Sequence, residues 1–120
     1  MSRRWTLGLL AGALSVPVVF APAAAHADAT AYLIGVHVRP GYNFPNADAA
    51  LGYGYGICDK VAAGQPFAQV MGDVRGDFNT DDDYQASYLI AQAVNELCPA
   101  QISQLRTSAA HYQSPPGAHP

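Results

Sequence analysis

The sequence predicts an all-α fold, a small bundle of four to five short helices stapled by one disulfide. Three observations predict it. Apolar residues recur at three- and four-residue spacings in successive segments, as on the buried face of amphipathic helices. Glycine and proline, which end helices, separate these segments. Two cysteines, Cys58 and Cys98, follow an export signal, and export brings them to a compartment where disulfides form.

Residues 1–27 have the pattern of a secretory signal peptide. Arg3 and Arg4 precede an apolar run that starts at Trp5, and small residues follow up to Ala27. The run is shorter than the roughly 20 apolar residues that a membrane-spanning helix needs. We therefore expect cleavage after Ala27, no membrane span in the mature chain, and a secreted protein that is extracellular or held at the cell wall.

The mature chain, residues 28–120, has the length of a single domain. All nine acidic residues and four of the six basic ones lie in it, which gives a net charge of −5 with neutral histidines. Nucleic-acid binding needs a basic face, and here the basic residues are scattered singly. Nucleic acid is therefore not an expected partner.

The helical domain is expected over residues 28–108, and its first helix begins behind the cap Asp28. This helix runs to about Val38, and Leu33, Ile34 and Val38 belong to its apolar face. Arg39-Pro40-Gly41 end it. The aromatic side chains of the extended linker that follows, Tyr42 to Pro45, are expected to fold back onto the core.

A second helix is expected from Asn46 or Asp48 to about Ala63, with Gly64 as its terminator. Residues 52–56 include three glycines, each of which costs a helix about 1 kcal/mol relative to alanine. A strand or a loop is therefore the alternative for this segment. We favour the helix because the apolar spacing continues through it and because glycine lets a neighbouring helix approach closely.

A third helix is expected to start near Pro66, with one apolar stripe that reaches Phe78. Thr80 is expected to begin the fourth, in which three aspartates occupy the first turn and meet the positive end of the helix dipole. The predicted inward face of this helix runs through Tyr84 and Tyr88. It continues through Ser87, Ala91, Val94 and Cys98, and Ile90, Ala93 and Leu97 widen it.

A short fifth helix is expected over residues 100–108, and residues 109–120 form a Pro-rich tail without a core-forming pattern. We expect this tail to be mobile.

Cys58 and Cys98 are expected to form a structural disulfide between the second helix and the end of the fourth. In the chain-entropy treatment, a loop of about 41 residues closed in this way stabilises a fold by about 4 kcal/mol. That is a large share of the total stability of a small domain, about 5–15 kcal/mol. A redox-active or metal-binding pair is the alternative, but such sites favour closely spaced cysteines.

The segments around the two cysteines resemble a known family. Residues 54–59, Gly-Tyr-Gly-Ile-Cys-Asp, then Gly64, and then residues 93–101, Ala-Val-Asn-Glu-Leu-Cys-Pro-Ala-Gln, are similar to the small secreted mycobacterial proteins grouped as domain of unknown function 732. The resemblance covers about residues 29–108. It implies a small, helical, disulfide-linked exported protein and no particular activity. Many members have histidine where this chain has Tyr55, so no histidine-dependent role is carried over.

One acidic segment approaches a calcium-binding pattern. Asp77, Asn79 and Asp81 match positions 1, 3 and 5 of an EF-hand loop. Position 6 requires glycine and is Asp82, and position 12 requires glutamate and is Tyr88. The segment is therefore interpreted as an acidic helix start, and no metal site is expected.

The sequence contains no nucleophile elbow and no phosphate-binding glycine loop. The histidines are dispersed and are interpreted as solvated. We expect neither a catalytic site nor a cofactor, and the protein is not expected to be an enzyme. An enzyme or metal binder of an unrecognised type remains a third alternative.

Tyrosine is abundant, with seven residues. Tyr53, Tyr55 and Tyr88 are candidate ligand-binding residues around a glycine-relieved groove between the second and fourth helices. The alternative is packing at the edge of the core, where each hydroxyl finds a hydrogen-bond partner. The leading functional hypothesis is an interaction or structural module of the cell envelope with an unknown envelope protein as partner. The alternative is a carrier or sensor of a lipid or another apolar ligand, such as haem.

Overall fold

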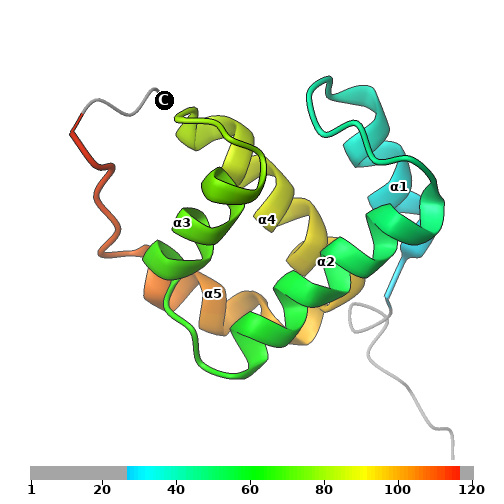
Figure 1. The fold of residues 1–120 in the computed structure, drawn as a ribbon. Helices are drawn as coiled ribbons and strands as arrows, with labels where there is room; N and C mark the ends of the chain where they lie inside the picture. The colour runs from blue at the N-terminus through cyan, green and yellow to red at the C-terminus, as the bar shows by residue number, and fades with distance from the viewer. Residues whose placement is uncertain (1–26, 117–120) are drawn as a thin grey trace, which may run out of the picture.

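The computed structural model describes residues 27–116, and its helices confirm the all-α prediction (Figure 1). The described residues form no strand. The predicted signal peptide, apart from Ala27, lies outside the described residues, as do residues 117–120 of the predicted tail. The elements in chain order are α1 (Ala29–Val38), α2 (Ala47–Ala62), α3 (Phe67–Asp77), α4 (Asp83–Leu97), a 3₁₀ turn (Pro99–Gln101) and α5 (Ile102–Ala109).

Helix α4 is the centre of the bundle. It contacts α1, α2, α3 and α5, and Figure 1 shows these helices arranged around it. The face that α4 buries is built from small and branched apolar residues, which let several helices pack close to it. Its buried apolar residues are Ala86, Leu89, Ile90, Ala93, Val94 and Leu97.

The predicted inward face of α4 is rotated in the structure. Ile90, Ala93 and Leu97, expected only to widen the face, are buried, whereas Tyr84 is 55% exposed and Tyr88 only half-buried. The two tyrosines therefore lie at the rim of the core.

The helix starts follow the predicted caps, with one correction. The side chain of Asp28 accepts a hydrogen bond from the backbone of α1, and Asn46 does the same for α2. Helix α4 begins at Asp83 and not at Thr80, because Asp82 is its cap and accepts from the backbone N–H groups of the first turn. The Thr80 hydroxyl instead accepts from the Asp82 N–H at 3.1 Å.

The glycine-rich segment of α2 is helical, which decides between the alternatives left open by the sequence. A Cβ added at Gly54 would lie 2.6 Å from a Leu97 methyl carbon and 2.7 Å from the Tyr32 ring, so α2 approaches α4 and α1 closely at this point. A Cβ at Gly52 or Gly56 would meet nothing within 4 Å. One of the three glycines therefore permits the packing.

The linker between α1 and α2 folds back onto the core, as predicted. Tyr42 is buried, and its ring meets those of Phe44 and Phe78 with centroid distances of 6.3 and 5.4 Å. Its hydroxyl donates to the Gln85 carbonyl of α4 at 2.6 Å. Burial raises the pKa of Tyr42 to about 12, although the nearby Arg39 partly opposes the shift.

Candidate functional site

A groove of about 670 Å³ lies between the second half of α1, the linker that follows it, and the start of α2. The linker takes its shape from two left-handed positions, Gly41 at φ +113° and Asn43 at φ +55°, and from two prolines. The groove is lined mainly by apolar atoms, and its lining includes Leu33, Ile34 and Phe44.

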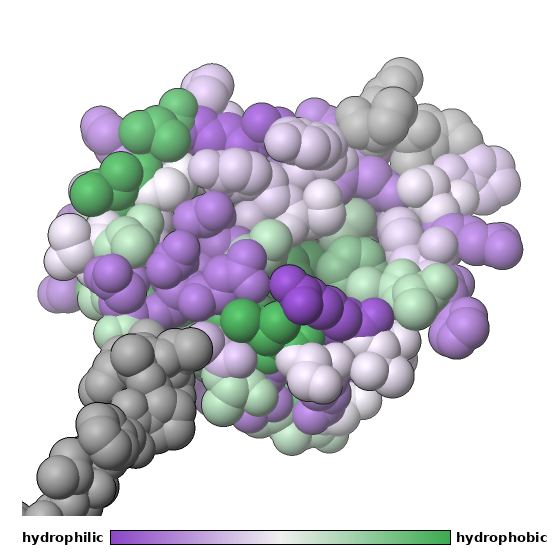
Figure 2. Space-filling model, turned by 180° about the vertical axis from the view of Figure 1, so that it is seen from behind, coloured by the Kyte–Doolittle hydropathy of each residue, from purple (hydrophilic) through white to green (hydrophobic). Residues whose placement is uncertain are grey.

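Helix α1 is apolar on both of its sides. Tyr32 and Val36 face inward and are buried, at 0% and 7% exposure. Ile34 and Val38 face outward and are 58% and 67% exposed, which corrects their predicted place on the inward face. Figure 2 shows hydrophobic side chains at the edge of the molecule where α1 lies. A surface helix normally carries polar residues on its outer side, so this surface is unusual.

The charge around the groove differs from that of the whole chain. None of the described residues that line it is Asp or Glu, although the chain has nine of these. Its ionisable lining residues are His37, Arg39 and Tyr42. The groove is therefore an apolar surface with a neutral to basic edge on an acidic protein.

Arg39 connects the end of α1 to α4. Its guanidinium carbon lies 4.7 Å from the ring centre of Tyr84 and 5.2 Å from that of Tyr88, within the range of cation–π contacts. One guanidinium nitrogen lies 4.0 Å from a carboxylate oxygen of Asp82, and its Nε is buried without a hydrogen-bond partner in the described part of the chain. These contacts fix one end of the groove.

The structure does not bring Tyr53, Tyr55 and Tyr88 together. The Tyr53 ring packs on Phe78, and its hydroxyl donates to an Asp77 carboxylate oxygen at 2.7 Å. Burial and this bond raise the pKa of Tyr53. Tyr55 is 44% exposed on another side of α2, since residues two apart on a helix do not face each other. None of the three lines the groove.

The hydroxyls of several tyrosines donate to backbone carbonyls on neighbouring helices. Tyr32 donates to Ala50 at 2.8 Å and Tyr88 donates to Gly35 at 3.0 Å. Burial raises the pKa of Tyr32 to about 12. The Tyr88 contact matches the alternative in which tyrosines pack at the edge of the core, whereas Tyr32 is fully buried. The two contacts join α1 to α2 and to α4.

The predicted disulfide is present. Cys58, on α2, and Cys98, directly after α4, are bonded with Cα atoms 6.0 Å apart, and no free cysteine remains. The bridge lies close to Gly54 and Leu97 in sequence, where α2 and α4 approach each other closely. Covalent and packing constraints therefore act on the same pair of helices.

Comparison with known proteins identifies the family. The profile of a family described as protein of unknown function (DUF732) matches residues 27–100, which include α1 to α4 and both cysteines. The chain belongs to this family. No curated protein and no solved structure matches it. Helix α5 and the segment after it lie beyond the matched residues.

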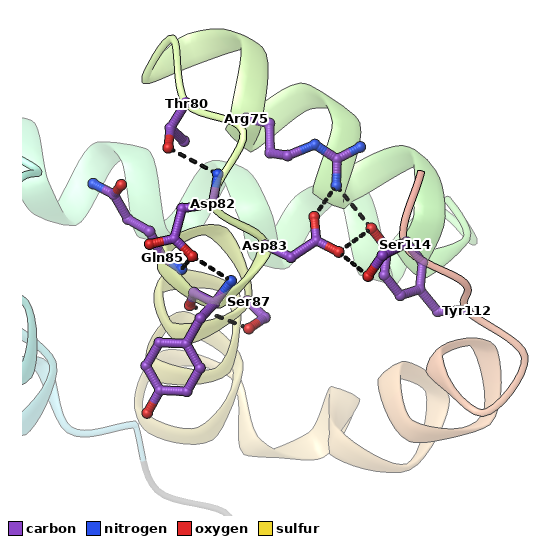
Figure 3. A network of polar contacts seen from close by, with 9 residues as sticks. Arg75, Thr80, Asp82, Asp83, Gln85, Ser87, Tyr112 and Ser114 are labelled. Atoms are coloured by element: carbon purple, nitrogen blue, oxygen red, sulfur yellow. Dashed lines mark hydrogen bonds and ion pairs between the residues drawn. The ribbon is translucent and has the colours of Figure 1, made fainter. Parts of the chain in front are cut away.

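This DUF732 protein also contains a polar cluster around the buried Asp83, which the sequence did not indicate (Figure 3). Asp83, in the first turn of α4, is 6% exposed. Its carboxylate accepts hydrogen bonds from Arg75 at 2.5 Å, from Tyr112 at 2.8 Å and from Ser114. Burial alone would raise the pKa of Asp83, but these donors outweigh it and hold the pKa below its ordinary value.

Tyr112 and Ser114 belong to the segment that was expected to be a mobile tail. The Tyr112 ring also meets the ring of Phe67 edge-on, with centroids 5.0 Å apart. The start of the tail therefore contacts α3 and α4. An isolated tyrosine in a Pro-rich stretch carries no periodic signal, so the sequence offered no means of finding this contact.

The acidic segment of the DUF732 domain has the character expected of a helix start. Asp82 caps α4, and Asp83 is held by the three donors described above. No group of three or more His, Cys, Asp or Glu residues suited to a metal ion occurs among residues 27–116. In the same range, no helix has the length and apolar character needed to cross a membrane.

Proposed function

We propose that this protein is an exported binding module of the cell envelope that acts by non-covalent contact through the outer side of α1. We call this region the α1 surface and define it as Ile34, Val38 and the adjoining groove. The proposal includes no catalytic step. The protein serves as a rigid support that presents an apolar helix.

The export part of the proposal has two supports. The sequence before Asp28 has the charged, apolar and small-residue segments of a signal peptide. The disulfide is of the kind that forms and persists in oxidising compartments outside the cytosol. A domain this small buries a limited core, so a covalent link between α2 and α4 suits a protein that must persist outside the cell.

The binding part depends on one observation, the apolar outer side of α1. Among the α-helices of residues 27–116, α1 alone has no Asp, Glu, Lys or Arg. Exposed apolar side chains grouped beside a groove are typical of interaction sites, and a groove of this kind suits an apolar segment of an envelope protein. The described residues that line the groove include no acidic side chain, so the groove presents no carboxylate to an apolar segment.

The test is a pull-down from envelope extract with the mature protein and two matched variants. Ile34→Glu places a charge on the α1 surface, whereas Tyr55→Glu places the same charge on an exposed aromatic of α2. We expect recovery of a specific protein with the wild type and with Tyr55→Glu, and its loss with Ile34→Glu. Equal recovery by both variants would contradict the proposal, as would recovery of nothing above background by the wild type.

A second candidate function is the carriage of an apolar ligand in the same groove. Its volume, about 670 Å³, lies within the range of about 300–1,000 Å³ that is usual for small-molecule sites. This location replaces the tyrosine groove expected from the sequence, because the space between α2 and α4 is filled at Gly54.

Native mass spectrometry of the protein from an exporting host separates the two functions. A carrier would retain a small adduct that is lost on denaturation. Ala47→Trp, which introduces a bulky side chain into the groove lining, would abolish that adduct, whereas Ala62→Trp at the far end of α2 would keep it. A bare mass would rule out this second function and leave the binding module.

A further inference from the structure

The predicted cleavage point lies beside an unusual contact of the backbone. The N–H of Asp28 donates to the carbonyl of Glu96 at 2.5 Å, which joins the start of α1 to the last turn of α4. The Asp28 side chain accepts from the Ala31 N–H at 2.9 Å, and its carbonyl accepts from the Tyr32 N–H at 3.1 Å. The backbone nitrogen, the backbone carbonyl and the carboxylate of Asp28 are thus all engaged.

The acceptor of this bond is well suited to a positive charge. The last carbonyl groups of a helix lack donors within the helix and form the negative end of its dipole. Glu96 lies in this last turn, one residue before the end of α4 and two before Cys98 of the disulfide. In the precursor, the donor at this position is the neutral amide of the Ala27–Asp28 peptide bond.

We propose that Asp28 is the first residue of the mature protein and that its α-ammonium group binds the C-terminal end of α4. The proposal rests on the export part of the proposed function and is independent of the α1 surface. Both Ala27 and Asp28 are exposed residues at the surface of the bundle.

The processing step is a simple hydrolysis. Water supplies a hydroxyl group to the Ala27 carbonyl carbon, and the carbon–nitrogen bond to Asp28 breaks. The protons end on the Asp28 nitrogen, so the products are an Ala27 carboxylate and an Asp28 ammonium. A neutral N–H donor is thereby replaced by a charged one at the same position, and charge-assisted hydrogen bonds are shorter and stronger than neutral ones.

The position of cleavage determines whether this contact forms. Adjacent residues of an extended chain are about 3.5 Å apart. An ammonium group on Ala27 would therefore lie one residue away from the Glu96 carbonyl, and the Asp28 nitrogen would still be a neutral amide. Cleavage at the Ala27–Asp28 bond places the charge where α4 provides the acceptor.

Three forms of the chain test the proposal, each made by traceless removal of a fusion tag. The first begins at Asp28 with a free amine, the second is the same chain with an acetylated amine, and the third begins at Ala27 with a free amine. The acetylated form keeps an N–H donor and loses only the charge. The form that begins at Ala27 keeps the positive charge but places it one residue before Asp28.

We expect the Asp28 form to melt about 2–6 °C above both of the others at neutral pH. We also expect its α1 amides, such as that of Val36, to exchange more slowly with solvent. Equal melting temperatures for the Asp28 and Ala27 forms would overturn the proposal. N-terminal sequencing of the protein exported by its host gives the second test, and a mature chain that begins at another residue would also overturn it.

Discussion

The contact between α2 and α4 and the outer side of α1 treat apolar side chains in opposite ways. The first packs them closely, and the second leaves them exposed. Between α2 and α4, Gly54 leaves no room even for a methyl group against Leu97, and the Cys58–Cys98 bridge closes the same pair of helices. On α1, two large aliphatic side chains, Ile34 and Val38, are more than half exposed.

The difference indicates how the domain separates stability from recognition. The packing of α2 on α4 is close at Gly54 and is fixed by a covalent bridge, so it contributes stability. Helix α1 is attached to this support through Tyr32, Val36 and the tyrosine hydroxyl contacts, and its outer side is left without a partner within the described residues. Substitutions in the two regions should therefore have different consequences.

The largest expected effect follows removal of the disulfide. Replacement of both Cys58 and Cys98 by serine should lower the free energy of unfolding by about 4 kcal/mol, because the unfolded chain regains the freedom of a 41-residue loop. Urea denaturation of the oxidised protein and of the double variant measures the change. Similar unfolding midpoints for the two proteins would mean that the bridge is not what secures α2 on α4.

The next effect concerns Asp83, which ties the segment after α5 to α3 and α4. Asp83→Asn should cost about 2–3 kcal/mol at pH 7, because Arg75 loses its charged partner in a largely buried site. The folded-state pKa of Asp83 is below its unfolded value, so the stabilisation is present above about pH 4 and is lost as the pH falls through the folded pKa.

Thermal melts from pH 7 to pH 2 measure this dependence. The gap in stability between wild type and Asp83→Asn should narrow in the acidic range. Asp59→Asn, at an exposed position on α2, serves as the control and should run parallel to the wild type. A gap that stays constant down to the lowest pH would disprove the role given to the carboxylate.

A smaller effect is expected at two glycines of α2. Replacement by alanine should change the free energy of unfolding in opposite directions at Gly54 and Gly56. Gly54→Ala should destabilise the protein by about 1–2 kcal/mol, because overpacking against Leu97 and Tyr32 outweighs the better helix propensity of alanine. In Gly56→Ala, the new Cβ would lie in open space, and the substitution should stabilise the protein by up to about 1 kcal/mol. Chemical denaturation measures the stability of both variants. Stability changes of the same sign would argue against close packing at Gly54.

The smallest expected effect on stability belongs to the α1 surface. Ile34→Glu should change the free energy of unfolding by no more than about 0.5 kcal/mol, because the side chain is already more than half exposed. Val36→Ala, two residues away on the buried side, should cost about 1–2 kcal/mol. Comparable losses of stability for Ile34→Glu and Val36→Ala would mean that the outer side of α1 is packed and not available to a partner.

Much of this fold follows from local features of the sequence. The caps Asp28 and Asn46, and Gly64 at φ +88°, set helix ends that were predicted correctly, and the two cysteines fixed the pairing of α2 with α4. These features act through a few neighbouring residues or through a covalent bond. The sequence signal for them is therefore direct.

The features that were missed depend on tertiary packing. In α1, apolar residues occur all round the helix, so periodicity does not reveal that Tyr32 and Val36 face inward and that Ile34 and Val38 face outward. The groove depends on how the linker folds over α1 and α2. The contact of Tyr112 with Asp83 joins residues 29 positions apart, which local patterns do not encode.

Site-specific photo-crosslinking tests the central claim, that recognition is on α1 and stability between α2 and α4. A photoreactive phenylalanine analogue is placed at Ile34 in one sample and at Tyr55 in another, and each protein is exported by its own host and irradiated in place. We predict a discrete crosslinked product from position 34 and none above background from position 55. A product from position 55 alone, or no product from either position, would contradict the assignment of the α1 surface.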